Sequence, residues 1–375
     1  METTKEVLQE KINAAAGALY MSLELSDKKW KTALSAGGTK VRQYAVEGGN
    51  RAELLAVIEK AKQRCGLSAG AKVVCCYEAG REGFWVHRFL SEAGIENLVV
   101  DSSSIEVKRR ARRTKTDRLD AGKLLSMLLR HCAGEPDVWQ VLRVPSRAEE
   151  DARRTHRELE RLGQEHTGHT NRIGALLALH GIRAQNIGGR GWQERLAGYC
   201  QELGWHAAAE LKRESARLAL VKSQQREIQT AQDALLKSAQ GPQILRLARL
   251  CGIGVKSAWT LFYEFFWRRF NNRREVGSCA GLTGTPYQSG DSEREQGISK
   301  AGNKRVRWLM VELAWSWLRY QPESELSRWY GERFGHGGKR QRRIGIVALA
   351  RKLLIAIWRY LEHGVVPAGA RLKGV

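Results

Sequence analysis

The chain of 375 residues is long enough for two or three domains, and a hydrophobic content of 42% excludes a disordered protein. Lysine and arginine number 63 against 40 aspartates and glutamates, a formal net charge of +23, which favours nucleic acid as the partner over an anionic membrane surface. A polar N-terminus, no apolar run long enough to span a bilayer, and seven cysteines without CxxC spacing predict a cytoplasmic protein with reduced thiols and no membrane partner.

Short strands and helices alternate along the first hundred residues. We expect three strands within residues 18–46, a helix over about Arg51–Cys65, a buried strand at Lys72–Tyr77, a helix at about Gly83–Ala93 and a strand at Asn97–Val100. A three-strand meander, then strand–helix alternation, then an acidic helix is typical of an α/β domain of the ribonuclease H type. The sequence predicts such a domain over residues 1–145.

Two acidic residues lie at positions where domains of the ribonuclease H type have carboxylates. Glu24 lies in the first strand, and Glu78 follows the strand Lys72–Tyr77. An acid inside an otherwise apolar strand is costly unless it is ionically paired or bound to metal. Glu78, at a strand end, could equally be a solvated loop acid.

A dense run of cations comes next, and two acids follow at its end. The cations are Lys108, Arg109, Arg110, Arg112, Arg113, Lys115 and Arg118. Asp117 and Asp120 begin a helical pattern, and residues three apart share one face of a helix. The cations suit a nucleic-acid backbone, and the two carboxylates suit a divalent cation. Capping of the helix N-terminus is the alternative interpretation of both aspartates.

The pattern of polar and apolar residues changes at about Ser146, where long polar helices with heptad-like apolar spacing begin. A first helix is broken by the glycines at 188–191, and a second runs from about His206 to Ala239. Two helices of this length that return on each other predict an antiparallel coiled-coil hairpin over residues 146–240.

Residues 241–375 predict a mainly helical C-terminal domain. Ile244–Leu261 has the helix-hairpin-helix pattern, whose Gly252 and Gly254, with Lys256, would approach DNA phosphate, although an ordinary packing corner explains it equally well. A glycine-rich loop carries Ser289, where serine beside glycine is usually turn chemistry. Candidate phosphate contacts follow at Lys300, Asn303, Lys304, Arg305 and Arg307.

With these segments described, the chain resembles the DEDD-type transposases of bacterial insertion sequences, namely the insertion sequence 110 family and its 1111-like group. The resemblance covers nearly the whole chain. Its sharpest blocks are YEAGREGFWVHRFL at 77–90, RRTKTDRLDAGKLL at 112–125, LCGIGVKSA at 250–258 and SGDSEREQGISKAGNKRVRWLMVELAW at 289–315.

The resemblance implies an N-terminal domain like the Holliday-junction resolvases, whose four carboxylates bind Mg²⁺ or Mn²⁺. The matching positions are Glu24, Glu78, Asp117 and Asp120. The family's first acid is ordinarily aspartate, so glutamate at position 24 lengthens that ligand by one methylene. The resemblance further implies that Ser289 is the nucleophile that attacks DNA, and that the coiled-coil hairpin lies between the two catalytic domains. Because the two halves of the site are far apart in sequence and on separate domains, an active site formed in trans between subunits is one open possibility.

The resemblance also implies a homo-oligomer in which dimers assemble into a tetramer. A structured non-coding guide RNA from the element would pair with donor and target DNA. The expected activity is DNA strand exchange by a transposase through a serine–DNA covalent intermediate, in the bacterial cytoplasm and at the nucleoid. No nucleotide cofactor is expected, because each bond broken in transesterification is replaced by another, and the lack of a P-loop string agrees with this. Two alternatives stay open: a metal-dependent junction endonuclease that uses water, and a non-catalytic nucleic-acid-binding descendant of a transposase.

Overall fold

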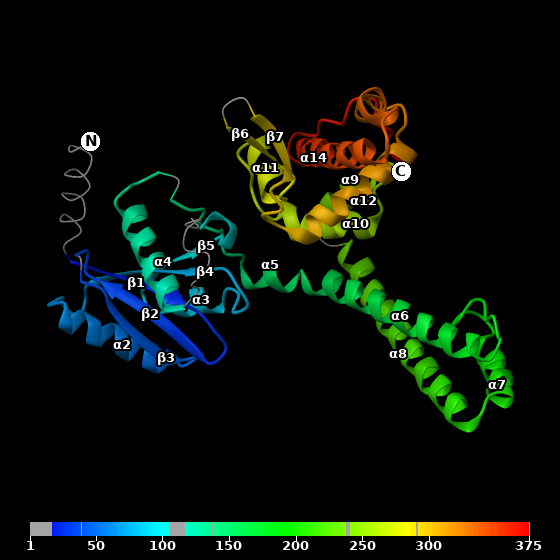
Figure 1. Cartoon of the computed structure of the whole chain (residues 1–375), viewed down its shortest axis with the longest axis horizontal. Helices are drawn as coiled ribbons and strands as arrows, with labels where there is room; N and C mark the ends of the chain where they lie inside the picture. The colour runs from blue at the N-terminus through cyan, green and yellow to red at the C-terminus, as the bar shows by residue number, and fades with distance from the viewer. Residues whose placement is uncertain are drawn as a thin grey trace. The chain divides into compact units, whose positions relative to one another are not determined.

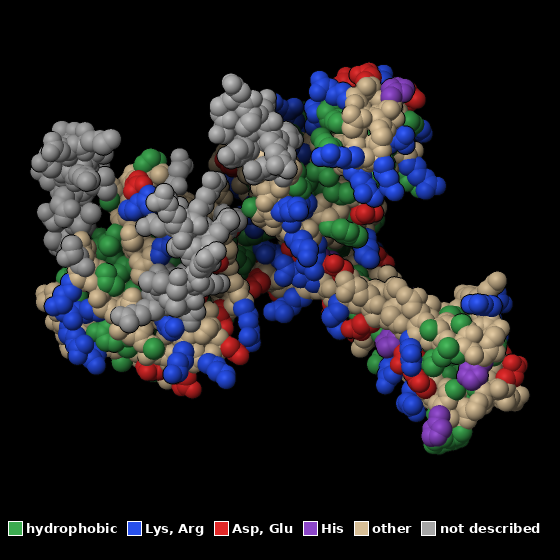
Figure 2. Space-filling model, in the orientation of Figure 1, with side chains coloured by type: hydrophobic (Ala, Val, Ile, Leu, Met, Phe, Trp, Pro, Cys, Tyr) green, Lys and Arg blue, Asp and Glu red, His purple; other side chains and the backbone are tan. Residues whose placement is uncertain are grey.

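The computed structural model describes residues 17–38, 40–105, 117–136, 138–237, 241–289 and 292–374. Within these ranges, only the backbone is described for residues 103, 117–120, 286–289 and 292–296. The chain divides into two compact units, residues 1–145 and 146–375 (Figure 1). Lys and Arg side chains are spread over the visible face of both units (Figure 2).

A single five-stranded sheet organises the first unit. Its strands are β1 (Ala18–Glu24), β2 (Lys29–Ser35), β3 (Arg42–Glu47), β4 (Lys72–Glu78) and β5 (Glu96–Val100). Their order across the sheet is β3-β2-β1-β4-β5. β2 is antiparallel to both of its neighbours, whereas β1, β4 and β5 are parallel to one another. The carboxyl ends of β1, β4 and β5 therefore meet at one edge of the sheet.

Helices cover both faces of this sheet. β1 is buried along almost its whole length, as expected for a strand covered on both sides. Alternate residues such as Leu19 and Leu23 pack against α2 (Arg51–Arg64) and α3 (Trp85–Glu92). Residues such as Tyr20 pack instead against α4 (Asp117–Cys132), which crosses the other face (Figure 1). A short 3₁₀ turn, η1 (Ser102–Ser104), follows β5.

Two long helices returning on each other open the second unit. Its first helices are α5 (Arg147–Asp151), α6 (Arg154–Ala178), α7 (Trp192–Glu202) and α8 (Trp205–Leu235). Contacts from Thr155 to Gln232 and from His169 to Glu214 show that α6 and α8 run antiparallel. The first helix that the sequence predicts is divided between α5 and α6. The glycines that were expected only to interrupt the helices also introduce α7, which packs at the closed end of the hairpin.

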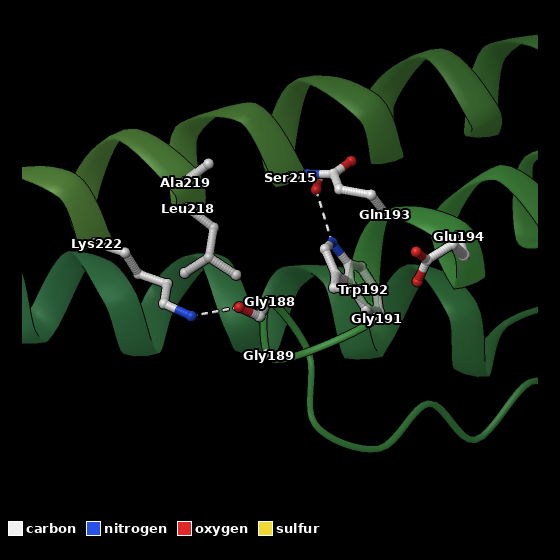
Figure 3. Close-up of a pocket in the computed structure, with 10 residues that line it drawn as sticks. All are labelled: Gly188, Gly189, Gly191, Trp192, Gln193, Glu194, Ser215, Leu218, Ala219 and Lys222. Carbon is white, nitrogen blue, oxygen red and sulfur yellow. Dashed lines mark hydrogen bonds between the residues drawn. The ribbon is translucent and has the colours of Figure 1, made fainter.

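The glycine turn before α7 fits tightly against α8 and borders a hollow of about 210 Å³ (Figure 3). Gly188 has a φ of +68°, and a Cβ there would lie 2.7 Å from the Leu218 side chain. Lys222 donates a hydrogen bond to the Gly188 carbonyl, and Trp192 Nε1 donates to Ser215 Oγ at 2.7 Å. These contacts fix the turn, so the glycine is required by close packing.

The remainder of the second unit is mainly helical and surrounds one core. Its elements are α9 (Gly241–Ala248), α10 (Val255–Leu261), the π-helical η3 (Phe262–Phe266), α11 (Arg273–Cys279), β6 (Gly284–Ser289), β7 (Ser292–Ile298), α12 (Lys304–Tyr320), α13 (Glu325–Tyr330), the π-helical η4 (Gly331–Gly335) and α14 (Lys339–His363). Trp259, Trp317 and Leu353 are fully buried in that core.

The predicted class, an α/β part followed by a mainly helical part, is confirmed at this level. None of the helices in the described part of the chain combines the length and apolar character that crossing a bilayer requires.

Candidate functional site

Two of the predicted carboxylates lie side by side at the carboxyl edge of the sheet. β1 and β4 are parallel neighbours with Leu23 opposite Tyr77, so the next residues, Glu24 and Glu78, end adjacent strands. Leu23 and Tyr77 are fully buried, Glu24 is half-buried and Glu78 is exposed. The strand pairing therefore brings together two acids that are more than fifty positions apart in sequence.

The first turn of α4, which carries the other two predicted acids, begins beside β1. Ser22 Oγ donates a hydrogen bond of 2.6 Å to the carbonyl of Ala121. Ser22 is two residues before Glu24, and Ala121 directly follows Asp120. Asp117 is the first residue of α4, but the side chains of Asp117 and Asp120 lie outside the description. The backbone thus places the start of α4 next to the half of β1 that ends in Glu24.

A hollow of about 220 Å³ opens where the chain leaves β1 and β4. It is lined by residues 24–27 and 78–82. Arg81 pairs with Asp27 at 3.0 Å and links the two loops. Carboxylate oxygens are the ligands that Mg²⁺ and Mn²⁺ prefer, so Glu24 and Glu78 fit such an ion in chemical type. Among the side chains that the structure describes, no group of three potential metal ligands occurs.

A further acid at this edge, Asp101, was missed by the sequence reasoning. It directly follows β5, whose Val100 pairs with Glu78 of β4. The Asp101 N–H donates to the Gln140 carbonyl at 2.9 Å, which fixes the backbone there. The available signal was its position directly after a predicted strand. Because parallel strands end at a common edge of the sheet, that position predicts a place near Glu24 and Glu78.

Ser289 lies in a β-hairpin and not in the glycine-rich loop that the sequence predicts. β6 and β7 are antiparallel, and Ser289, the last residue of β6, pairs with Ser292, the first residue of β7. Ser299 N donates to the Thr283 carbonyl at 2.9 Å, which closes the base of the hairpin. Gly281 allows this closure, because it has a φ of +66° and a Cβ there would lie 1.9 Å from the Ala301 carbonyl oxygen. The Ser289 side chain is outside the description.

The predicted phosphate contacts at the start of α12 divide into two groups. Asn303 caps the helix, since its Oδ1 accepts two backbone N–H groups of the first turn. The guanidinium groups of Arg305 and Arg307 are also engaged, Arg305 with carboxylates and Arg307 with a backbone carbonyl at 3.3 Å. Lys300 and Lys304 are exposed.

The predicted helix-hairpin-helix turn joins α9 to α10. Gly252 has a φ of +90°, and its carbonyl accepts a 2.8 Å hydrogen bond from Ser316 Oγ of α12. This contact gives Gly252 a packing role. Gly254 caps the start of α10, and both Gly254 and Lys256 are exposed.

The side chains of the basic run 108–118 are not among those that the structure describes. Lys108, Arg109, Arg110, Arg112, Arg113 and Lys115 lie outside the described residues, and only the backbone of Arg118 is described.

Sequence reasoning also missed a buried ion-pair cluster that joins the base of α6 to the start of α12. Glu264, 3% exposed, lies 2.8 Å from His156 Nε2 and accepts from Arg157 Nε at 2.6 Å and Arg305 Nη1 at 3.3 Å. Glu160 pairs with Arg305 at 2.5 Å. Burial alone would raise the pKa of Glu264, but hydrogen bonds from Arg157 and His156 hold it well below its usual range.

Comparisons with known proteins match this chain to transposases, and the matches cover most of its length. Residues 245–327 match the family model described as the transposase IS116/IS110/IS902 family. The chain is 41% identical over 376 residues to a putative transposase, y4rJ, of Sinorhizobium fredii (strain NBRC 101917 / NGR234), with 95% of each chain covered. It is 31% identical over 253 residues to a second putative transposase of that organism, y4qE. This alignment covers 67% of this chain and 60% of the relative.

Proposed function

Because the chain belongs to the IS116/IS110/IS902 family of transposases, we propose that it catalyses DNA strand exchange for an insertion sequence, guided by a structured non-coding RNA. The observation that carries the proposal is the meeting of Glu24 and Glu78 at one sheet edge beside the start of α4. Acids from separate elements at one edge are suited to phosphoryl transfer.

The catalytic fold in this proposal is ribonuclease H-like. The strand order β3-β2-β1-β4-β5, with only β2 reversed, supports it. The antiparallel pair α6 and α8 supports a coiled-coil hairpin, and α9 with α10 supports a helix-hairpin-helix. We infer three functional regions on this basis: residues 1–145, 146–240 and 241–375.

Glu24, Glu78, Asp117 and Asp120 would hold Mg²⁺ or Mn²⁺. Bound there, the ion would supply positive charge to a scissile phosphate in a site that is otherwise negative. The protein's own contribution is to fix the carboxylates. β1 and β4 hold Glu24 and Glu78 through the parallel ladder, and the Ser22–Ala121 hydrogen bond holds α4 against β1.

Ser289 would be the nucleophile. Its Oγ loses a proton and forms a bond to phosphorus, the bond from phosphorus to the 3′-oxygen breaks, and that oxygen takes up a proton as a free 3′-hydroxyl. The resulting phosphoserine conserves the bond for the later joining step, so no nucleotide cofactor is needed. Its place at the end of β6, paired with Ser292 of β7, gives its backbone a defined position in a two-stranded ladder, which is what a positioned nucleophile requires.

The net charge of +23 supports nucleic-acid binding. The basic run 108–118, the turn at Gly252–Lys256 and the exposed Lys300 and Lys304 are the proposed contacts with DNA and guide RNA. We propose a homo-oligomer, a dimer that assembles to a tetramer, in which carboxylates of one subunit act with Ser289 of another.

The experiment compares two glutamates that line the same hollow. Purified protein with its RNA is incubated with labelled DNA that carries the element ends, in the presence of Mg²⁺. Glu78→Gln should abolish cleavage and strand exchange, because the amide keeps the shape and removes the charge. Glu82→Gln should remain active, because Glu82 accepts a 3.0 Å hydrogen bond from Trp85 Nε1 and has no role in the proposal. Normal activity of Glu78→Gln would overturn the proposed site.

A further inference from the structure

The outward face of α12 has an unusual composition for a helix on a protein surface. Its inner face, including Met310, Leu313 and Trp317, packs into the core. Such a helix is expected to present charged and polar residues outward. Two tryptophans lie there instead: Trp308 is 62% exposed and Trp315 is 46% exposed. Together their rings expose an area on the order of 200 Å².

Charged residues surround these rings in a regular order. Along the helix the exposed face reads Lys304, Trp308, Glu312, Trp315 and Arg319, and all five side chains are exposed. At about 100° per residue they fall within an arc of roughly 80°, so they form one stripe. Lys304 and Arg319 are about 22 Å apart along the axis at about 1.5 Å per residue. Cations thus mark both ends of the stripe, with indole rings and one carboxylate between them.

We propose that this stripe binds an unpaired stretch of nucleic acid, with bases stacked on Trp308 and Trp315. This inference rests on the proposed function and assigns it a new binding surface. The two rings are about 10 Å apart along the helix, close to the rise of three stacked bases at about 3.4 Å each. Lys304 and Arg319 meet phosphates at the two ends.

Glu312 determines which form of nucleic acid fits. A carboxylate in the middle of the stripe repels a phosphate backbone but accepts hydrogen bonds from the N–H groups of unpaired bases, including the ring N3–H of thymine and uracil. A duplex presents phosphates to such a surface and keeps its bases stacked inside. An unpaired strand can turn its bases to the helix, so the surface favours single strands.

The surface also adjoins the turn before α10. Ser316, which neighbours the stripe on α12, binds the carbonyl of Gly252 at 2.8 Å. The exposed Gly254 precedes α10, and the exposed Lys256 lies in the first turn of that helix.

The experiment measures binding by the full-length protein after purification at high salt, which strips bound nucleic acid. The probes are labelled single strands of about 12 nucleotides, one thymidine and one uridine oligomer, and a duplex of equal length. Trp308→Ala and Trp315→Ala should each weaken single-strand binding about tenfold, since stacking on one ring contributes roughly 5- to 150-fold. Phenylalanine at either position should restore most of the affinity. Binding of the duplex should change less than about twofold.

The matched control is Trp205→Ala, because Trp205 is 77% exposed at the start of α8, away from this surface. It should bind like the parent protein. The thymidine and uridine arms show whether DNA or RNA is the preferred strand. Equal loss for single strand and duplex, no loss in either alanine variant, or a change only in oligomeric state by light scattering would each overturn the assignment.

The proposed function can fail separately. Cleavage of element DNA by a parent protein whose tryptophan variants bind normally would refute only the stripe. Stacking-dependent binding by a parent protein that never cleaves would refute only the transposase mechanism.

Discussion

Replacing Glu264 by glutamine tests the buried cluster that joins α6 to α12. Glutamine keeps the size of the side chain but leaves the positive charges of Arg157 and Arg305 without their buried partner. Removing one member of a buried ion pair costs about 3–5 kcal/mol. Arg157 is 48% exposed and Arg305 is 32% exposed, so water screens part of this loss and we expect about 3 kcal/mol. In a unit of this size the melting temperature should fall by about 6–12 °C.

The pH dependence has a definite sign. The pKa of Glu264 is lowered from its ordinary 4.5, so its contribution to stability is fully present above that value and is lost as the pH falls below about 4.5. The parent should therefore lose stability in acid more steeply than Glu264→Gln, as measured by thermal melting followed by circular dichroism.

Glu160→Gln is the control for this prediction, because Glu160 binds the same Arg305 but is 39% exposed. It should cost less than about 1 kcal/mol. Equal melting temperatures for the two variants, or a Glu264→Gln protein as stable as the parent, would refute the reasoning.

Three further predictions concern binding and catalysis. Affinity for nucleic acid should fall steeply between low and physiological salt, because the net charge is +23; binding that stays flat in a salt titration would remove the premise. Asp117→Ala and Asp120→Ala should each abolish strand exchange with little change in melting temperature, whereas a loss of more than about 2 kcal/mol with activity retained would favour helix capping. Glu24→Asp should be active and Glu24→Gln inactive in the same assay, since only a carboxylate holds the cation; equal activity of Glu24→Gln and the parent would exclude Glu24 as a ligand.

Elements whose pattern is local could be predicted from the sequence. The apolar run from Lys72 was predicted as a strand and forms β4, and the helix predicted from Arg51 forms α2. The short helix α7 could not be predicted in this way. Its first residue, Trp192, is held by Ser215, which is 23 residues away, so a long-range contact stabilises a segment that reads as a glycine break.

The same distinction between local patterns and long-range contacts applies to the candidate site residues. The positions of Glu24 in the first strand and of Glu78 after the strand Lys72–Tyr77 could be predicted, because both strands are visible as apolar runs, and the parallel pairing of β1 and β4 makes the two residues neighbours. Glu264 could not, because its partners His156 and Arg157 lie 108 and 107 positions away. The only local signal was an acid within the apolar run FYEFF, which is costly unless it is paired. The hairpin around Ser289 was likewise hidden, since glycines on both sides suggested a loop.

The proposed chemistry predicts a covalent bond between Ser289 and DNA. The direct measurement is gel electrophoresis of a denatured reaction between the protein with its RNA and end-labelled element DNA. Ser292→Ala is the control, since Ser292 pairs with Ser289 across the hairpin. We predict a labelled protein–DNA adduct in the parent and in Ser292→Ala, none in Ser289→Ala, and none when a chelator removes divalent metal. An adduct that persists in Ser289→Ala, or DNA cleavage in that variant with no adduct in the parent, would contradict the proposed mechanism.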